Sequence, residues 1–118
     1  MVVGKSALTV SPPAPWTEAE EALLDALGDR TRRQVLLRLR EGPKPVVEIA
    51  SGLSVSRPAV SQHLKVLKDA GLVTDRAVGT RRIYAVDPDG LATLRGFLES
   101  FWKDALARFK DAAEQPPR

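Results

Sequence analysis

Residues 46–71 read VVEIASGLSVSRPAVSQHLKVLKDAG and contain two helical apolar patterns with a short turn between them. The first pattern ends near Gly52, because glycine tolerates the left-handed conformation that stops a helix. Its apolar face combines Val46 or Val47 with Ile49, Ala50 and Leu53. The turn, residues 52–55, is too short to be a linker, so both helices must pack steeply around one core. This pattern predicts a helix-turn-helix.

The second helix of this motif is expected over residues 57–70. Ser56 can cap it, because its hydroxyl can accept a hydrogen bond from an unpaired amide of the first turn. Pro58 lies in that first turn, where no amide is left without a partner. Val60, Leu64 and Leu67 repeat at i, i+4 and i+7, and Gly71 is placed to end the helix.

The opposite face of this second helix carries hydrogen-bond donors and positive charge: Arg57, Ser61, Gln62, Lys65 and Lys68. Only Asp69, at the far end, is acidic. The alternative, a helix surface that serves solubility alone, would normally mix both charge signs. Small donors and long basic side chains near a helix N-terminus suit base edges and phosphates in a DNA groove.

Length and composition restrict the class of protein. A chain of 118 residues suits one domain with its own core. It has no cysteine, which excludes disulfides and thiolate metal sites and favours a reducing cytoplasm. No apolar run reaches the roughly 18 residues of a membrane span, and the N-terminus lacks a signal-peptide pattern. A soluble cytoplasmic protein without membrane contact is expected.

Positive charge is concentrated in the middle of the chain. Residues 17–29 contain five acidic residues and no basic one, whereas residues 30–86 contain twelve basic and four acidic residues. Residues 87–118 are nearly balanced, with five basic and six acidic residues. The basic block therefore coincides with the helix-turn-helix. Such a block binds polyanions, and DNA is the polyanion that suits this motif.

The ends of the chain flank one predicted domain, residues 16–113. Residues 1–15 contain three prolines and one charge and are expected to form a disordered tail, as are residues 114–118. Trp16 is positioned to pack on the start of a first helix, in which Thr17 and Glu20 have the spacing of a capping box. This helix should end near Leu27, with Leu23, Leu24 and Leu27 as its apolar stripe.

A second helix is expected to begin after Asp29 and to end at residues 42–43. Its predicted buried face consists of Val35, Leu36, Leu37 and Leu39. Arg30 and Arg33 lie outside this face, where they either form a solvated surface or reach phosphate.

After Gly71 the pattern changes to short β-branched and apolar runs, residues 72–78 and 81–86, separated by Gly79 and Thr80. This predicts a β-hairpin, which beside a helix-turn-helix forms a wing. Its basic residues are Arg76, Arg81 and Arg82. They suit the phosphate backbone or the adjacent minor groove, although basic residues at a sheet edge can also serve solubility alone.

Asp87 and Pro88 are expected to start a last, long helix that reaches about Ala113. Its apolar residues occupy more of the helix than one small domain can cover, and exposing them would leave a large apolar patch. We therefore expect a dimer interface shared with the first helix: Leu23, Leu24, Leu27, Leu94, Phe97, Leu98, Phe101, Trp102, Ala105 and Phe109. The alternative is that this helix folds back on its own core.

Three segments together resemble the ArsR/SmtB family of bacterial winged helix-turn-helix repressors: ALGDRTRRQVLLRLREG, VVEIASGLSVSRPAVSQHLKVLKDAGLV and RAVGTRRIYAVDPDGL. The resemblance implies a mainly α fold, with four helices, a small β-hairpin and a fifth helix. It also implies a homodimer that pairs through its first and last helices and reads the major groove with the fourth. Transferred to this sequence, the groove-facing residues are Ser56, Arg57, Ser61, Gln62 and Lys65, with Arg81 and Arg82 in the wing.

Many members of this family sense metals, and this sequence departs from their pattern. It has no cysteine, and its one histidine, His63, lies in the predicted recognition helix. We expect His63 to form a hydrogen bond at the helix surface or to contact phosphate. Carboxylates without imidazole or thiolate partners make a poor soft-metal site. The sequence therefore resembles the branch that represses without a metal, and no metal or cofactor is predicted.

The predicted function is that of a homodimeric repressor of transcription that binds a palindromic operator in double-stranded DNA. Its recognition helix spans residues 57–70 and its basic wing residues 76–82. An inducer, if there is one, would be a small molecule or a partner protein. An enzyme is not expected, because one histidine, no cysteine and no glycine-rich phosphate loop leave no plausible acid, base and nucleophile. The alternative is a winged helix that binds protein or RNA without reading DNA sequence.

Overall fold

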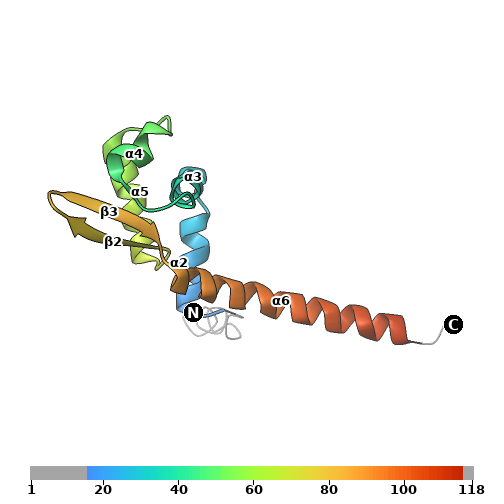
Figure 1. The fold of residues 1–118 in the computed structure, drawn as a ribbon. Helices are drawn as coiled ribbons and strands as arrows, with labels where there is room; N and C mark the ends of the chain where they lie inside the picture. Colours follow the sequence, from blue (N-terminus) through green and yellow to red (C-terminus); the bar gives the residue numbers. More distant parts are fainter. Residues whose placement is uncertain (1–15, 116–118) are drawn as a thin grey trace, which may run out of the picture.

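The computed structural model describes residues 16–115 (Figure 1). It contains five helices and three short strands, and their order is α2 (Glu18–Leu27), α3 (Arg30–Leu39), β1 (Lys44–Pro45), α4 (Val46–Ser51), α5 (Arg57–Asp69), β2 (Val73–Val78), β3 (Arg81–Val86) and α6 (Pro88–Glu114). The predicted tail over residues 1–15 lies outside the described residues, as do residues 116–118 of the second predicted tail. The prediction of a mainly helical winged helix-turn-helix is confirmed.

The longer helices begin at the predicted caps, Thr17, Asp29, Ser56 and Asp87. At α2 the Thr17 hydroxyl accepts a hydrogen bond from the Glu20 amide (3.1 Å), and the Glu20 carboxylate accepts one from the Thr17 amide (2.8 Å). At α5 the Ser56 hydroxyl accepts a hydrogen bond from the Ala59 amide (3.2 Å). These caps satisfy amides that have no partner within the helix.

The core lies where α2, α3, α4 and α5 meet the inner end of the sheet, and its fully buried side chains are Leu23, Val35, Ile49, Val60, Leu64, Leu67, Leu72 and Val73. The predicted apolar face of α5 is confirmed, since Val60, Leu64 and Leu67 are all fully buried. The prediction for Leu37 was wrong, because its side chain is 58% exposed. Val35 and Leu39 are one turn apart and face the core, so Leu37, midway between them, points away.

The sheet has three antiparallel strands in the order β1-β3-β2. The predicted hairpin is β2–β3, in which Val78 pairs with Arg81 across the turn formed by Gly79 and Thr80. Gly79 has a φ of 62°, as a tight turn that matches the strand twist requires. Strand β1 was not predicted. It has only two residues, which pair with Tyr84 and Ile83 of β3.

Two glycines of the helix-turn-helix have different roles. Gly71, which follows α5, has a φ of 86°, as expected for a helix stop. Gly52, which follows α4, has a φ of −95°, so the predicted left-handed conformation was wrong there. Gly52 instead leaves room for the side chain of Arg38, which passes where a Cβ atom would lie. Arg38 donates a hydrogen bond to the Glu48 carbonyl oxygen (2.8 Å) and so joins α3 to α4.

Helix α6 projects away from the rest of the molecule, on the side opposite the β2–β3 hairpin (Figure 1). Its 27 residues extend about 40 Å at 1.5 Å per residue. The radius of gyration is 20.0 Å, against about 13 Å for a compact domain of about 100 residues. Only the first part of α6 contacts the core, so the alternative in which this helix folds back on its own domain was wrong.

Trp16 makes a contact that was not predicted. Its ring packs edge-on against Phe97 of α6, with centroids 5.9 Å apart, and Phe97 packs in the same way against Phe101 at 5.0 Å. Trp16, which lies just before the cap of α2, therefore contacts the N-terminal half of α6. No helix among residues 16–115 is long and apolar enough to cross a membrane.

Candidate nucleic-acid interface

The open side of α5 carries a continuous row of donor and basic side chains. Arg57, Ser61, Lys65 and Lys68 follow one another at intervals of four, four and three residues, which keeps them on one side of a helix. We call these four residues the recognition row. All four are exposed, as are Ser56 at the start and Gln62 beside the row. The predicted contact residues of the helix, except His63, therefore lie together on an accessible surface.

Two members of the row, Lys65 and Lys68, have an acidic neighbour. The Lys65 ammonium lies 2.9 Å from a carboxylate oxygen of Asp69, one turn further along α5. Both side chains are well exposed. An exposed pair of this kind contributes little to stability, so a phosphate can replace Asp69 as the partner of Lys65 at low cost.

His63 lies on a different flank of α5. Its side chain is half-buried, unlike those of the recognition row. At the start of α3, the backbone hydrogen bond from Arg32, together with the positive charge of Arg32, holds the pKa of Asp29 below its ordinary value. The expected surface hydrogen bond or phosphate contact of His63 stays a prediction.

The register of the wing separates its three arginines. Arg76 pairs with Ile83 and Val78 pairs with Arg81, so Arg76 and Arg81 lie on the same face of the hairpin. Arg82 pairs with Ala77 and therefore lies on the other face, together with Asp75. All three arginines are exposed, and Arg76 and Arg81 have no ion-pair partner among the described residues.

Asp75 was not predicted as a functional residue. One of its carboxylate oxygens lies 2.9 Å from the Lys68 ammonium on α5, and the other lies 3.4 Å from the Arg82 guanidinium on β3. The side chain is only 9% exposed. The hydrogen bond from Lys68, reinforced by the positive charges of Lys68 and Arg82, holds the pKa of Asp75 below its ordinary value. The signal available in the sequence was that Asp75 is the only acidic residue of the predicted hairpin, residues 72–86.

Two arginines of the basic block have a structural role. Arg32 donates hydrogen bonds to the carbonyl oxygens of Ala26 (2.7 Å) and Asp25 (3.2 Å), and Arg33 donates one to Leu27 (2.8 Å). These carbonyls belong to the last turn of α2, where they have no partner within the helix. Arg33 is therefore engaged at the α2–α3 junction, and the prediction that it reaches phosphate is not supported.

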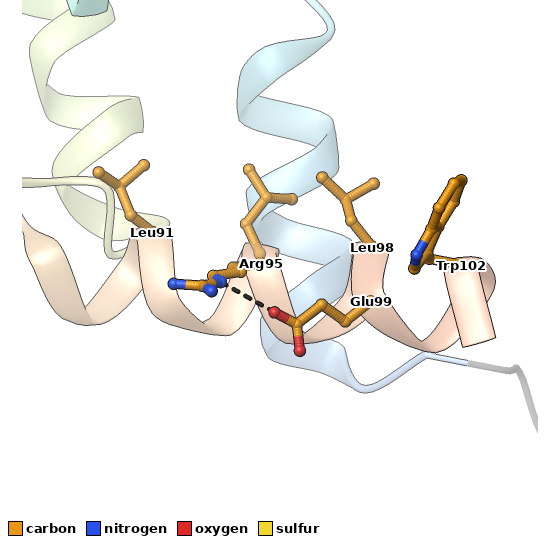
Figure 2. A pocket seen from close by; sticks show the side chains of 6 residues that line it. Leu91, Arg95, Leu98, Glu99 and Trp102 are labelled. Atoms are coloured by element: carbon orange, nitrogen blue, oxygen red, sulfur yellow. Dashed lines mark hydrogen bonds and ion pairs between the residues drawn. The ribbon is translucent and has the colours of Figure 1, made fainter.

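The apolar surface of α6 is the second exposed feature. Its exposed apolar side chains are Leu91, Leu98, Phe101, Trp102, Leu106 and Phe109. Leu91, Leu98 and Trp102 form a shallow groove along the helix, beside the ion pair of Arg95 and Glu99 at 2.8 Å (Figure 2). The six exposed apolar residues of this helix, from Leu91 to Phe109, are called the α6 apolar face below.

Two of the residues predicted for a dimer interface are not on this surface. Leu23 is buried in the core of the protomer, and Phe97 is buried near the root of α6 between Trp16 and Phe101. Leu24, Leu27 and Leu94 are partly buried, whereas Ala105 is exposed beside the α6 apolar face. The helical period alone did not show which of these residues the core would cover.

Among the described residues, no three His, Cys, Asp or Glu side chains form a cluster that could hold a metal ion. Asp87 instead caps α6 by accepting a hydrogen bond from the Asp89 amide (2.9 Å).

Comparison with known proteins agrees with this arrangement. Residues 29–75 match the family described as bacterial regulatory protein, arsR family. The HTH-type transcriptional regulator Rv2034 of Mycobacterium tuberculosis (strain ATCC 25618 / H37Rv) is 60% identical over 84 residues, which are 71% of this chain and 78% of that protein. The HTH-type transcriptional repressor SmtB of Mycobacterium tuberculosis (strain CDC 1551 / Oshkosh) is 41% identical over 81 residues, 69% of this chain and 60% of that protein.

A solved structure is similar over most of the fold. It is the solution NMR structure of a homodimeric winged helix-turn-helix DNA-binding domain from Mycobacterium bovis, a possible ArsR-family transcriptional regulator. The TM-score is 0.59 and the sequences are 27% identical, with 84% of this chain and 83% of that chain covered. This chain belongs to the arsR family of bacterial regulatory proteins, because it has the helix-turn-helix and the wing and is 60% identical to a relative of which it covers 78%.

Proposed function

We propose that this protein is a homodimeric repressor of transcription that binds a palindromic operator in the bacterial cytoplasm. The observation that carries this proposal is the recognition row, which starts at the capped N-terminus of α5 and lies beside a basic wing. The N-terminus of a helix favours phosphate, and the first turns of a recognition helix are the part that reaches base edges.

The α6 apolar face supports the homodimer. The exposed parts of its six side chains amount to on the order of 600 Å², at the upper limit for an apolar patch on a monomer and close to the roughly 800 Å² per partner of a standard interface. A helix that leaves its own domain can pair with its copy. Leu94 lines the same groove, and Leu24, Leu27 and Ala105 complete the interface that we propose.

The residues of the interface with DNA have different roles. Arg57 is the best candidate for a base contact, because a guanidinium can donate two hydrogen bonds to guanine. Gln62 can pair in the same manner with adenine. Ser61 and Lys65 on α5, and Arg76 and Arg81 on the wing, bind phosphates, which sets the register and contributes salt-dependent affinity.

Twofold symmetry then determines the operator. Two recognition helices related by a dyad enter successive major grooves about 34 to 36 Å apart, so the two half-sites form an imperfect palindrome. A dimer bound at a promoter excludes RNA polymerase, which accounts for repression.

The test measures binding to the protein's own promoter and to random duplex at several salt concentrations. Arg57→Ala should lose about 1 to 3 kcal/mol on the cognate half-site, with little loss on sites altered at the contacted base. Arg81→Ala should weaken binding to every duplex equally and flatten the salt dependence by about 0.9 log units per lost phosphate contact. Lys103→Ala, an exposed lysine of α6 outside the proposed DNA contacts, is the control with the same loss of charge.

Two outcomes would contradict the proposal. Equal losses from Arg57→Ala and Arg81→Ala on all sequences would refute the division between base and phosphate contacts. Equal affinity of the unaltered protein for promoter and random duplex would favour the alternative function, a winged helix that binds protein or RNA.

A further inference from the structure

Asp75 connects the two elements that carry the proposed DNA contacts. It belongs to β2, and its carboxylate lies between Lys68 at the C-terminal end of α5 and Arg82 on β3. The carboxylate is 9% exposed, whereas the side chains of Lys68 and Arg82 are each about half exposed. One negative charge thus holds two cations, Lys68 of the recognition row and Arg82 of the wing, that would otherwise face solvent.

We propose that Asp75 determines specificity by withholding Lys68 and Arg82 from phosphate, which lowers the affinity for non-operator DNA, and by fixing the wing against α5. This inference rests on the proposed function. Asp75 acts here as a positioning residue, and it does not itself contact DNA.

The two acid–base contacts on α5 respond differently to an approaching phosphate. Asp69 is well exposed, so water can solvate its carboxylate when Lys65 turns to DNA. Asp75 is only 9% exposed and is held by two cations, whereas Asp69 has one, so withdrawing both partners would leave its carboxylate without a counter-charge. Lys68 and Arg82 are therefore retained by Asp75 when the duplex binds, whereas Lys65 is released.

Retaining these two cations affects non-operator DNA more than the operator. Non-specific binding comes almost entirely from phosphate contacts, each of which adds to the affinity and to its salt dependence. Operator binding also depends on base contacts by Arg57 and Gln62, which lie in the N-terminal half of α5, away from Asp75. Neutralising Lys68 and Arg82 therefore widens the difference between the two affinities.

The charge of Asp75 also prevents a repulsion. Lys68 and Arg82 approach the same carboxylate from different elements, so without it two positive charges would face each other across the junction of α5 and the wing. Repulsion at this short distance would move the hairpin away from α5. Arg76 and Arg81 would then lose their fixed position relative to the recognition row.

The experiment compares the full chain with Asp75→Asn, which keeps the shape of the side chain and removes its charge. Dissociation constants are measured on operator and random duplexes between about 50 and 200 mM salt, the range over which phosphate contacts change affinity strongly. Asp75→Asn should bind random duplex more tightly, with a salt slope steeper by about 0.9 per released cation. The operator-to-random affinity ratio should fall at least several-fold. Glu114→Gln, at the far end of α6, is the control for the same change in net charge.

A second comparison identifies the released cations. In the unaltered protein, Arg82→Gln should leave the salt slope on random duplex nearly unchanged, whereas Arg81→Gln should flatten it. In the Asp75→Asn background, Arg82→Gln should flatten the slope as well, which is the coupling that a double-mutant cycle detects.

Several results would overturn the inference. Weaker binding of Asp75→Asn to both duplexes with a flatter slope would show that Asp75 only supports the fold, and an unchanged slope and ratio would show that it withholds nothing. If Asp75→Asn does not fold, the two arginine variants decide. The inference is overturned if Arg82→Gln and Arg81→Gln flatten the salt slope on random duplex equally in the otherwise unaltered protein. If the unaltered protein does not prefer its operator over random duplex, the proposed function itself fails. This result differs from the ones that overturn only the role of Asp75.

Discussion

Leu98→Ala should weaken the proposed dimer without disturbing the protomer. The Leu98 side chain is 56% exposed on α6. Burying a whole leucine contributes about 1.5 to 3 kcal/mol, so covering this exposed half contributes about 1 to 1.5 kcal/mol. In a symmetric dimer the substitution removes it twice, about 2 to 3 kcal/mol, which corresponds to a dimer dissociation constant raised about 30- to 150-fold. Alanine favours helix, so α6 itself is preserved.

Sedimentation equilibrium over a range of protein concentrations measures this dissociation constant. Lys103→Ala is the matched control, because it introduces the same residue at an exposed position of α6 that does not belong to its apolar face, and it should change the constant by less than about twofold. Circular dichroism should give the same helix content for all three proteins. An unaltered protein that is monomeric at micromolar concentration, or equal constants for Leu98→Ala and Lys103→Ala, would refute the assignment of this face.

Three further predictions concern the protomer. Ser56→Ala should lower the free energy of unfolding by about 1 kcal/mol, measured by urea denaturation, because α5 loses its cap. The folded-state pKa of Asp75 lies below its ordinary value of 3.8. The ionised carboxylate therefore stabilises the folded protein at pH values above 3.8, and this stabilisation is lost as the pH falls through the folded-state pKa. The stability difference between the unaltered protein and Asp75→Asn should therefore be constant near neutral pH and shrink in acid; a difference that grows in acid would contradict this. Gly90→Ala should lower the melting temperature, because its Cβ would clash with the Gly71 carbonyl oxygen, whereas Gly96→Ala, with open space, should raise it slightly; equal shifts would show that the two helix ends do not meet closely.

Elements with local signals could be predicted from the sequence. Thr17, Ser56 and Asp87 each cap a helix through amides two or three residues away, so their function is encoded within a few positions. Gly79 and Thr80 determine the hairpin turn in the same local way. The period of Val60, Leu64 and Leu67 showed which side of α5 is buried, and by elimination which side faces solvent.

Contacts between distant residues could not be predicted in this way. Strand β1 pairs with β3 about forty positions later, and its two residues carry no signal of their own. Arg33 caps the helix that precedes its own, so its charge alone suggested phosphate instead. The apolar period of α6 does not reveal that Phe97 is covered by Trp16 while Leu98, the next residue, stays exposed.

The candidate interface shows the same division. Spacing and residue type were sufficient to place Arg57, Ser61 and Lys65 on one accessible side of α5, because a regular helix has a known period. Whether a wing arginine is free or engaged depends on strand register and on which helix lies beside the hairpin. Packing of the hairpin against α5 brings Asp75 to both Lys68 and Arg82, which only the folded chain makes neighbours.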